Sequence, residues 1–247
     1  MTADRWTQEV RHLLRLGRLL PLGLPHDGSW ITESAAGSVL RRAADPVREV
    51  RLGTLRISLA DPEQQVHEPV VPPPPSALPP GPLRIIAEFT VSADPTAPGV
   101  DPLPTTADRL RLALAAAAEE RLGLMVTEVD LLVTELSNGA DEAPVAVRPD
   151  DERPTAQPTG ADELRAASAA LSVPGVARLT DALGRPVHIE DVVDGKTTLP
   201  HRHVRVEVAV TAERRTADVA RAVRSAVTEA LPDHPSVAVV VTAVGRP

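Results

Sequence analysis

The residues most able to do chemistry are histidines and carboxylates in the C-terminal half: His188, Glu190, Asp191, Asp194, His201 and His203. Residues two apart on a strand share a face, as His188 and Glu190 would and as His201 and His203 would, so the two strands could converge on a metal if they paired. Imidazole and carboxylate are suitable ligands for zinc or another divalent ion. Such patterns also arise easily on the solvent face of a hairpin. We therefore expect solvated hairpin residues and no metal site.

Other catalytic motifs have little support in the sequence. Lys196 is the only lysine, and its Asp-Gly-Lys-Thr context lacks the glycine spacing of a phosphate loop, so it indicates a turn. Neither a dinucleotide-binding glycine motif nor a nucleophile elbow occurs. The absence of cysteine excludes thiol catalysis and cysteine-based zinc sites. We predict a protein that is not an enzyme, with no catalytic, cofactor-binding or metal-binding residues.

Composition narrows the class of protein further. Hydrophobic residues make up 43% of the chain, which is enough for real cores, although Trp6, Trp30 and Phe89 are the only aromatic residues. The net charge of -8 argues against a uniform basic surface for nucleic acid. No secretory signal is evident, and the apolar runs are too short to span a membrane. We expect a cytoplasmic protein with no integral membrane segment and no nucleic-acid partner.

An internal repeat gives the clearest indication of the fold. The second half contains an alternating strand, an amphipathic helix that opens Thr-Ala-Asp, and a buried strand, at 203–211, 216–231 and 236–244. The first half repeats this order at 82–91, 106–122 and 131–136. The pairs Arg205 with Glu207 and Glu213 with Arg214 are interpreted as parts of exposed faces.

A helix and a first strand precede this pattern in each half, at 33–44 and 50–59 and again at 161–171 and 187–193. The sequence thus predicts an α/β (α+β) fold built from two similar α-β-β-α-β units. Each unit would form a small mixed three-stranded sheet with its helices on one face, because a strand-helix-strand connection demands parallel pairing.

The predicted organisation has four parts. Residues 1–30 form an N-terminal amphipathic segment, 31–137 the first unit, 138–160 an acidic, proline-rich linker, and 161–247 the second unit. Residues 68–82 are a proline-rich loop within the first unit, and a PxxP ligand for a partner is the alternative interpretation of this loop.

The N-terminal segment carries the candidate contact residues. A helix over 5–20 would place apolar residues on one face and arginines largely elsewhere, a pattern typical of a membrane-surface or partner-binding helix. The candidate residues for contact with a partner or membrane are Trp6, Val10, Arg11, Leu13, Leu14, Arg15 and Arg18. The alternative is a helix that packs on the protein's own first unit.

The second unit resembles the alkaline shock protein family of bacterial envelope-stress proteins. The resemblance rests on AASAALSVPGVARL (166–179), HVRVEVAV (203–210), ADVARAVRSAVTEAL (217–231) and SVAVVVTAV (236–244), and the first unit looks like a diverged copy. Asp233-His234-Pro235 replaces the family's usual glycine before the last strand. The resemblance implies a non-enzymatic cytoplasmic scaffold or adaptor in the envelope stress response. It would act through protein contacts, with a separate membrane anchor protein or by self-association, at the inner face of the cell membrane.

Three alternative functions remain open from the sequence. An RNA-binding module of the KH type is weakened by the missing GxxG loop, the acidic charge and the lack of stacking aromatics. A small-ligand-sensing module would hold its ligand between the duplicated units. A metal-dependent hydrolase would use the histidine cluster.

Overall fold

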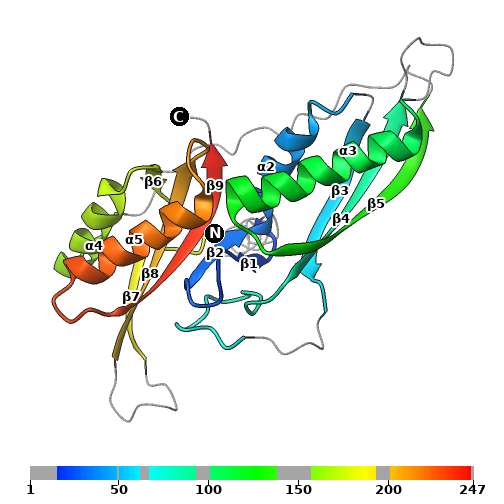
Figure 1. Cartoon of the computed structure of the whole chain (residues 1–247). Coiled ribbons are helices and arrows are strands. Elements are labelled where there is room, and N and C mark those ends of the chain that lie inside the picture. The colour runs from blue at the N-terminus through cyan, green and yellow to red at the C-terminus, as the bar shows by residue number, and fades with distance from the viewer. Residues whose placement is uncertain are drawn as a thin grey trace, which may run out of the picture.

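The computed structural model shows two β-sheets side by side, with helices packed on both (Figure 1). The structure describes residues 16–48, 50–61, 67–92, 101–137, 157–192 and 201–245. The mixture of helices and strands confirms the predicted α/β (α+β) fold class. Within the described residues, no helix is long and apolar enough to cross a bilayer.

Sheet B belongs to the first half of the chain and contains three strands: β3 (Val50–Leu59), β4 (Leu83–Ser92) and β5 (Val126–Ser137). The central strand β4 pairs antiparallel with β3 and parallel with β5. Alternate residues of β4, from Leu83 to Val91, are buried on one face, as the period-two pattern predicts.

Two helical segments pack against this sheet. α2 (Glu33–Ala44) precedes β3, and its start is capped by the Thr32 hydroxyl, which accepts a hydrogen bond from the Ala35 amide at 3.2 Å. α3 (Leu103–Ala116) continues into a π-helical turn, η1 (Ala117–Leu122), before β5. Gly123 ends η1 in the left-handed conformation at φ +86, which glycine adopts without the strain of a Cβ.

The second half contains α4, β6, β7, β8, α5 and β9, at Ala161–Ser172, Val176–Leu179, Val187–Val192, His201–Thr211, Thr216–Ala230 and Ser236–Gly245. β8 pairs antiparallel with both β6 and β7 and parallel with β9. Its pairing therefore matches that of β4 in the first half. The short strand β6 is not among the three strands predicted for this unit.

Sheet A is larger than the three strands expected, because the N-terminal segment joins it. β1 (Leu19–Pro21) pairs antiparallel with β2 (Ser29–Thr32), and β2 pairs parallel with β9. The order is β1-β2-β9-β8-β6, with β7 also on β8, which makes six strands. β2 supplies Ile31 to the main core, and β1 supplies Leu20.

The proline-rich loop covers the outer face of sheet A. Val71 from this loop joins a small buried cluster with Leu19, Trp30, Ala238 and Val240. The Trp30 indole donates to a loop carbonyl, Leu78 O, at 3.3 Å. Because Val71 and Pro74 are buried against the protein itself, the structure favours an internal packing role for this loop over the PxxP ligand interpretation.

Candidate functional site: an arginine-lined pocket between the two halves

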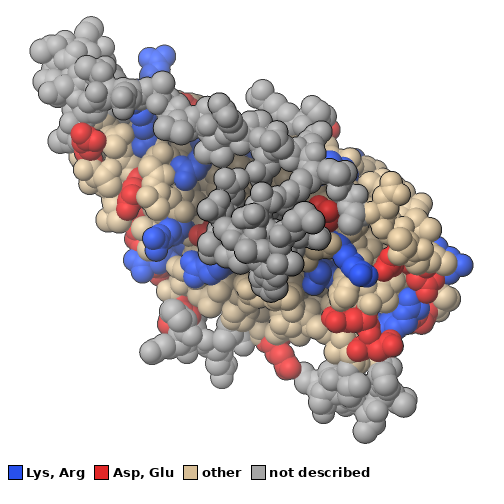
Figure 2. All heavy atoms as spheres, turned by 180° about the vertical axis from the view of Figure 1, so that it is seen from behind, with Lys and Arg blue, Asp and Glu red and all other residues tan. Residues whose placement is uncertain are grey.

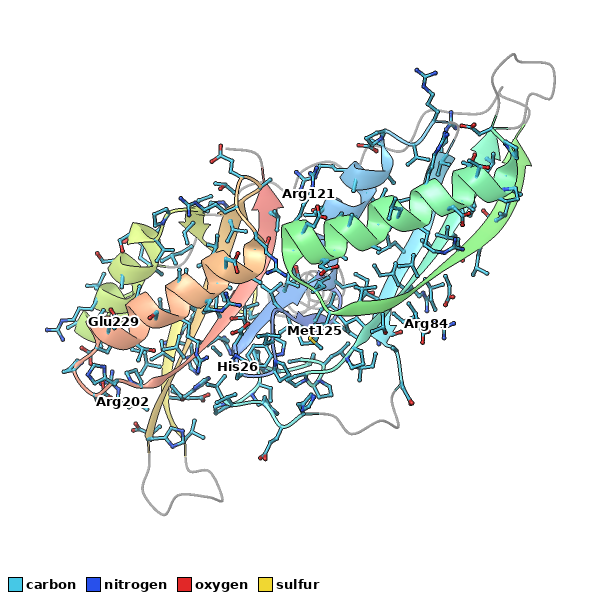
Figure 3. The ribbon with its side chains drawn as sticks, viewed as in Figure 1. His26, Arg84, Arg121, Met125, Arg202 and Glu229 are labelled. Carbon is cyan, nitrogen blue, oxygen red and sulfur yellow. The ribbon has the colours of Figure 1, made fainter. Side chains whose placement is uncertain are left out.

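A pocket of about 600 Å³ lies where the two halves of the chain meet. Its walls come from the end of α2, from η1, from the turn between β8 and α5, and from the end of β9. The lining residues are Val39, Arg42, Asp45, Arg121, Ala212, Arg214 and Val244. Figure 3 shows Arg121 at this junction, beside the end of β9.

Arg42 is held in place at the pocket wall. It lies in the last turn of α2, and its Nη2 donates to Val244 O on β9 at 2.7 Å, while its Nε donates to Ser38 O at 3.1 Å. These bonds tie α2 of the first half to the last strand of the second. A guanidinium with fixed backbone partners loses little further side-chain entropy when it contacts a ligand.

Arg121 and Arg214 are different, because the side chain of neither forms a hydrogen bond or ion pair with another residue in the described part of the chain. Both are exposed. Their guanidinium groups keep their full hydrogen-bonding capacity, which amounts to five N–H donors each. The pocket therefore combines one tethered guanidinium with two available ones.

The relative position of these arginines is fixed by close packing at the junction. A Cβ placed on Gly123 would lie 2.5 Å from the Cβ of Ala217, so the end of η1 approaches the start of α5 closely. Arg215 Nε also donates to Glu119 O at 3.1 Å. Arg121 lies between Glu119 and Gly123 in sequence, and Arg214 immediately precedes Arg215, so these contacts fix the spacing of the two arginines' backbones.

The charge of the pocket favours an anion. Three arginines and the single carboxylate of Asp45 leave an excess of two positive charges on its walls. Guanidinium groups match carboxylates and phosphates in a two-pronged geometry. The charged lining among the described residues is Arg42, Arg121, Arg214 and Asp45, an arrangement that can bind an anion.

The rest of the described surface is mixed in charge. Figure 2 shows basic and acidic side chains interspersed over both halves on the far side of the molecule. Many of them are paired at the surface, as Arg84 is with Asp130 and Arg111 with Asp108. The pocket differs from these surface pairs because its three arginines share one carboxylate, that of Asp45.

The histidine cluster is dispersed over the β7–β8 hairpin. The pairing sets Glu190 opposite His203 and Val192 opposite His201, while His188 Nε2 lies 3.6 Å from Glu190 Oε2. His203 is buried, and its Nδ1 shares a 2.8 Å hydrogen bond with Ser236 Oγ. In the part of the chain that the structure describes, no three His, Asp or Glu side chains are grouped to hold a metal; Asp194 lies outside that part.

Burial dominates the protonation of His203. It lowers the pKa of this imidazole to about 4, with neighbouring His201 and Arg205 acting in the same direction. The ring is therefore neutral at physiological pH, and its hydrogen bond to Ser236 positions β8 against β9.

The prediction that Arg205 and Glu207 form an exposed charged pair is wrong, because both side chains are largely buried. The Glu207 side chain is fully buried beneath the loop before β7, and its Oε2 accepts a hydrogen bond from the Leu183 amide at 2.8 Å. Its Oε1 lies 3.7 Å from Arg205 Nε, and neither atom has a hydrogen-bond partner. Burial raises the pKa of Glu207 to about 7 despite the nearby guanidinium.

The candidate contact residues of the N-terminal segment fall mostly outside the described residues. This applies to Trp6, Val10, Arg11, Leu13, Leu14 and Arg15. Arg18 is described, and it packs on the first half by donating from Nη2 to Ile57 O at 3.1 Å. The predicted helix through Leu20 is wrong at its end, because Gly17 takes φ +69 and Leu19 and Leu20 enter strand β1.

No sequence signal singled out the pocket. Arg42, Arg121 and Arg214 are three of many arginines in this chain, and they come together only because the two halves pack against each other. No family model, curated protein or solved structure matches this chain.

Proposed function

We propose that the protein is a non-enzymatic sensor that binds a small anion, a phosphate or a polycarboxylate, between its two halves. The observation that carries this proposal is the convergence of Arg121 and Arg214, both without partners among the described residues, with the tethered Arg42 on one pocket. Its volume of about 600 Å³ lies in the range of small-molecule sites.

The position of the pocket supports a sensing role. Its walls come from both halves of the chain, so a bound anion would contact α2 and η1 on one side and the turn before α5 on the other. A ligand that bridges two units strengthens their association by its own binding free energy. The protein would thus report the ligand through the stability of this junction.

The adaptor function stays a prediction from the family resemblance. In that proposal the protein acts in the cytoplasm, peripherally at the inner face of the membrane, through a membrane anchor protein or other protein partners. The sensing and adaptor roles are compatible, since an anion at the junction would alter the surface that a partner contacts.

The test is calorimetric titration of the full chain with inorganic phosphate and with citrate. Arg121→Gln and Arg214→Gln each remove one guanidinium, and a hydrogen bond between charged groups contributes roughly 1.5–3 kcal/mol. We expect binding about 10- to 100-fold weaker in each variant. The affinity of the unmodified protein should also fall as salt rises, because exposed charges are screened.

Arg178→Gln is the matched control, because Arg178 is an exposed arginine of β6 that does not line the pocket. It should leave the affinity unchanged. Equal loss in all three variants would mean that binding follows net charge rather than the pocket. Absence of binding by either anion at millimolar concentration would reject the proposal.

A further inference from the structure

β5 and β9 occupy the same place in their two sheets but differ at their outer edges. Each lies parallel to the central strand of its unit, β4 or β8. β9 is covered on its other side by β2, whereas β5 ends sheet B. Figure 1 shows β5 along the outer side of that sheet. Among the described residues, no strand pairs with the outer edge of β5.

The opposite edge of sheet B is protected by side chains. On β3, the Ile57 carbonyl accepts from Arg18 and its amide donates to Glu33 Oε1, while Arg41 donates to Gly53 O at 2.7 Å. These contacts occupy backbone groups that another strand would need. Such blocking is a common defence against edge-to-edge association.

The β5 edge has little of this protection and carries exposed apolar side chains. Leu132 and Val133 are 51% and 44% exposed, and Leu112 on the adjacent helix α3 is 71% exposed. One side chain, Arg111, donates to a β5 carbonyl, Val129 O, at 3.3 Å. In β9, by contrast, Val240 and Val241 are fully buried. Val240 is covered by Trp30 of β2 together with Leu19 and the loop residue Val71.

We propose that β5 pairs antiparallel with β5 of a second copy of this chain, joining two copies of sheet B into one six-stranded sheet. Two-fold symmetry requires antiparallel pairing of identical strands. A register with Leu132 opposite Leu132 of the second copy places Asp130 opposite Thr134 and Val133 opposite Leu131. No acidic side chain then lies directly opposite another, so this register avoids pairs of like charges and sets aliphatic residues against each other.

A second copy fits this edge better than an acidic or basic peptide. The outward run from Val129 to Val133 is apolar except for Asp130, which forms an ion pair within its own sheet with Arg84. The centre of the edge thus offers backbone groups and aliphatic side chains, while the carboxylates of Glu128 and Glu135 lie toward its ends. This inference is independent of the anion site, since no pocket residue lies on β5.

Single-cysteine crosslinking of the full chain tests the proposal, because the protein has no cysteine of its own. Leu132→Cys would place two thiols across the symmetry axis, so it should form a disulfide-linked dimer at least about 10-fold faster than Leu164→Cys. Leu164 is an equally exposed leucine on α4 and serves as the control. Equal rates for the two variants would overturn the proposal.

Sedimentation equilibrium supplies the second measurement. The unmodified chain should be a dimer at about 10 µM, and Leu132→Lys, which opposes two like charges at the axis, should weaken dimerisation at least about 100-fold. Leu164→Lys should not. If the unmodified chain is monomeric, or if its dimer is unaffected by Leu132→Lys, pairing through β5 is rejected. The β5 edge would then be available for a strand of a different protein.

Discussion

Arg221 on α5 donates two hydrogen bonds to the carboxylate of Asp27, at 3.2 and 3.0 Å, across 194 positions of sequence. Asp27 is buried, and its Oδ2 also accepts from the Leu24 amide at 2.8 Å. Burial alone would raise the pKa of Asp27. The hydrogen bonds from Arg221 and Leu24 outweigh this effect and lower the pKa below its usual value. This contact locks the loop between β1 and β2 onto the helix of the second half.

Asp27→Asn should reduce the free energy of unfolding at pH 7 by about 2 kcal/mol, because it removes charge-assisted hydrogen bonds. A carboxylate with a lowered pKa stabilises the fold above its unfolded pKa near 3.8, and that stabilisation disappears as pH falls through the folded value. Urea unfolding should therefore show the variant and the unmodified chain converging as the pH falls below 3.8. Asp218→Asn is the control: this exposed partner of Arg221 should contribute less than about 1 kcal/mol.

Glu207→Gln should make the protein more stable at pH 8 but not at pH 4.5. The folded pKa of about 7 exceeds the ordinary 4.5, so the folded state keeps a proton that the unfolded chain releases. Stability contributed by this group therefore falls as pH rises from 4.5 to 7. The difference between the two pH values should reach up to about 3 kcal/mol, measured by urea unfolding. Identical pH profiles for both proteins would contradict burial of an ionisable Glu207.

His203 should affect the pH dependence of stability in the opposite direction to Glu207, and His203→Gln tests this. The folded pKa of His203 is about 4, against an ordinary 6.5, so the unfolded chain binds the proton more readily and stability falls as pH drops through this window. In the unmodified chain this slope opposes that of Glu207 between pH 4.5 and 6.5, and the two nearly cancel. His203→Gln should therefore lose stability with rising pH, and Glu207→Gln with falling pH. A steep profile in the unmodified protein would count against this compensation.

Gly123→Ala should destabilise the junction between the halves and weaken anion binding. The added Cβ would lie 2.5 Å from Ala217, and the residue has a positive φ. We expect a loss of about 2–4 kcal/mol from strain and overpacking combined. Gly184→Ala separates the two causes, because Gly184 also has a positive φ but has no atom within 4 Å of its ideal Cβ. The control should lose about 1 kcal/mol in the same melting experiment and keep full anion affinity.

Local periodicity was sufficient to predict most elements of both halves. The alternating residues of β4 and β8 and the helical spacing of α5 each depend only on neighbours in sequence, and burial follows that pattern. The matched order of strand, helix and strand likewise led to the observed pairing around β4 and β8.

Features that depend on distant segments could not be predicted. Glu207 alternates with buried valines and so indicates an exposed face, but the loop before β7 covers it. The strand β2 is too short to show a period, and its partner β9 is about 200 residues away. Arg121 and Arg214 belong to different halves, so their convergence depends on how the halves pack.

The pairing of β2 with β9 also constrains when the protein can finish folding. Trp30 and Ile31 are translated about 200 residues before their partners Val240 and Val241. At elongation rates of about 5–20 residues per second, this delay is roughly 10–40 s. Sheet B has all its strands once Ser137 is translated, about 100 residues before β9, so it can form while β2 still lacks its partner β9. β2 is thus translated before the strands of sheet B, yet it completes its pairing after them.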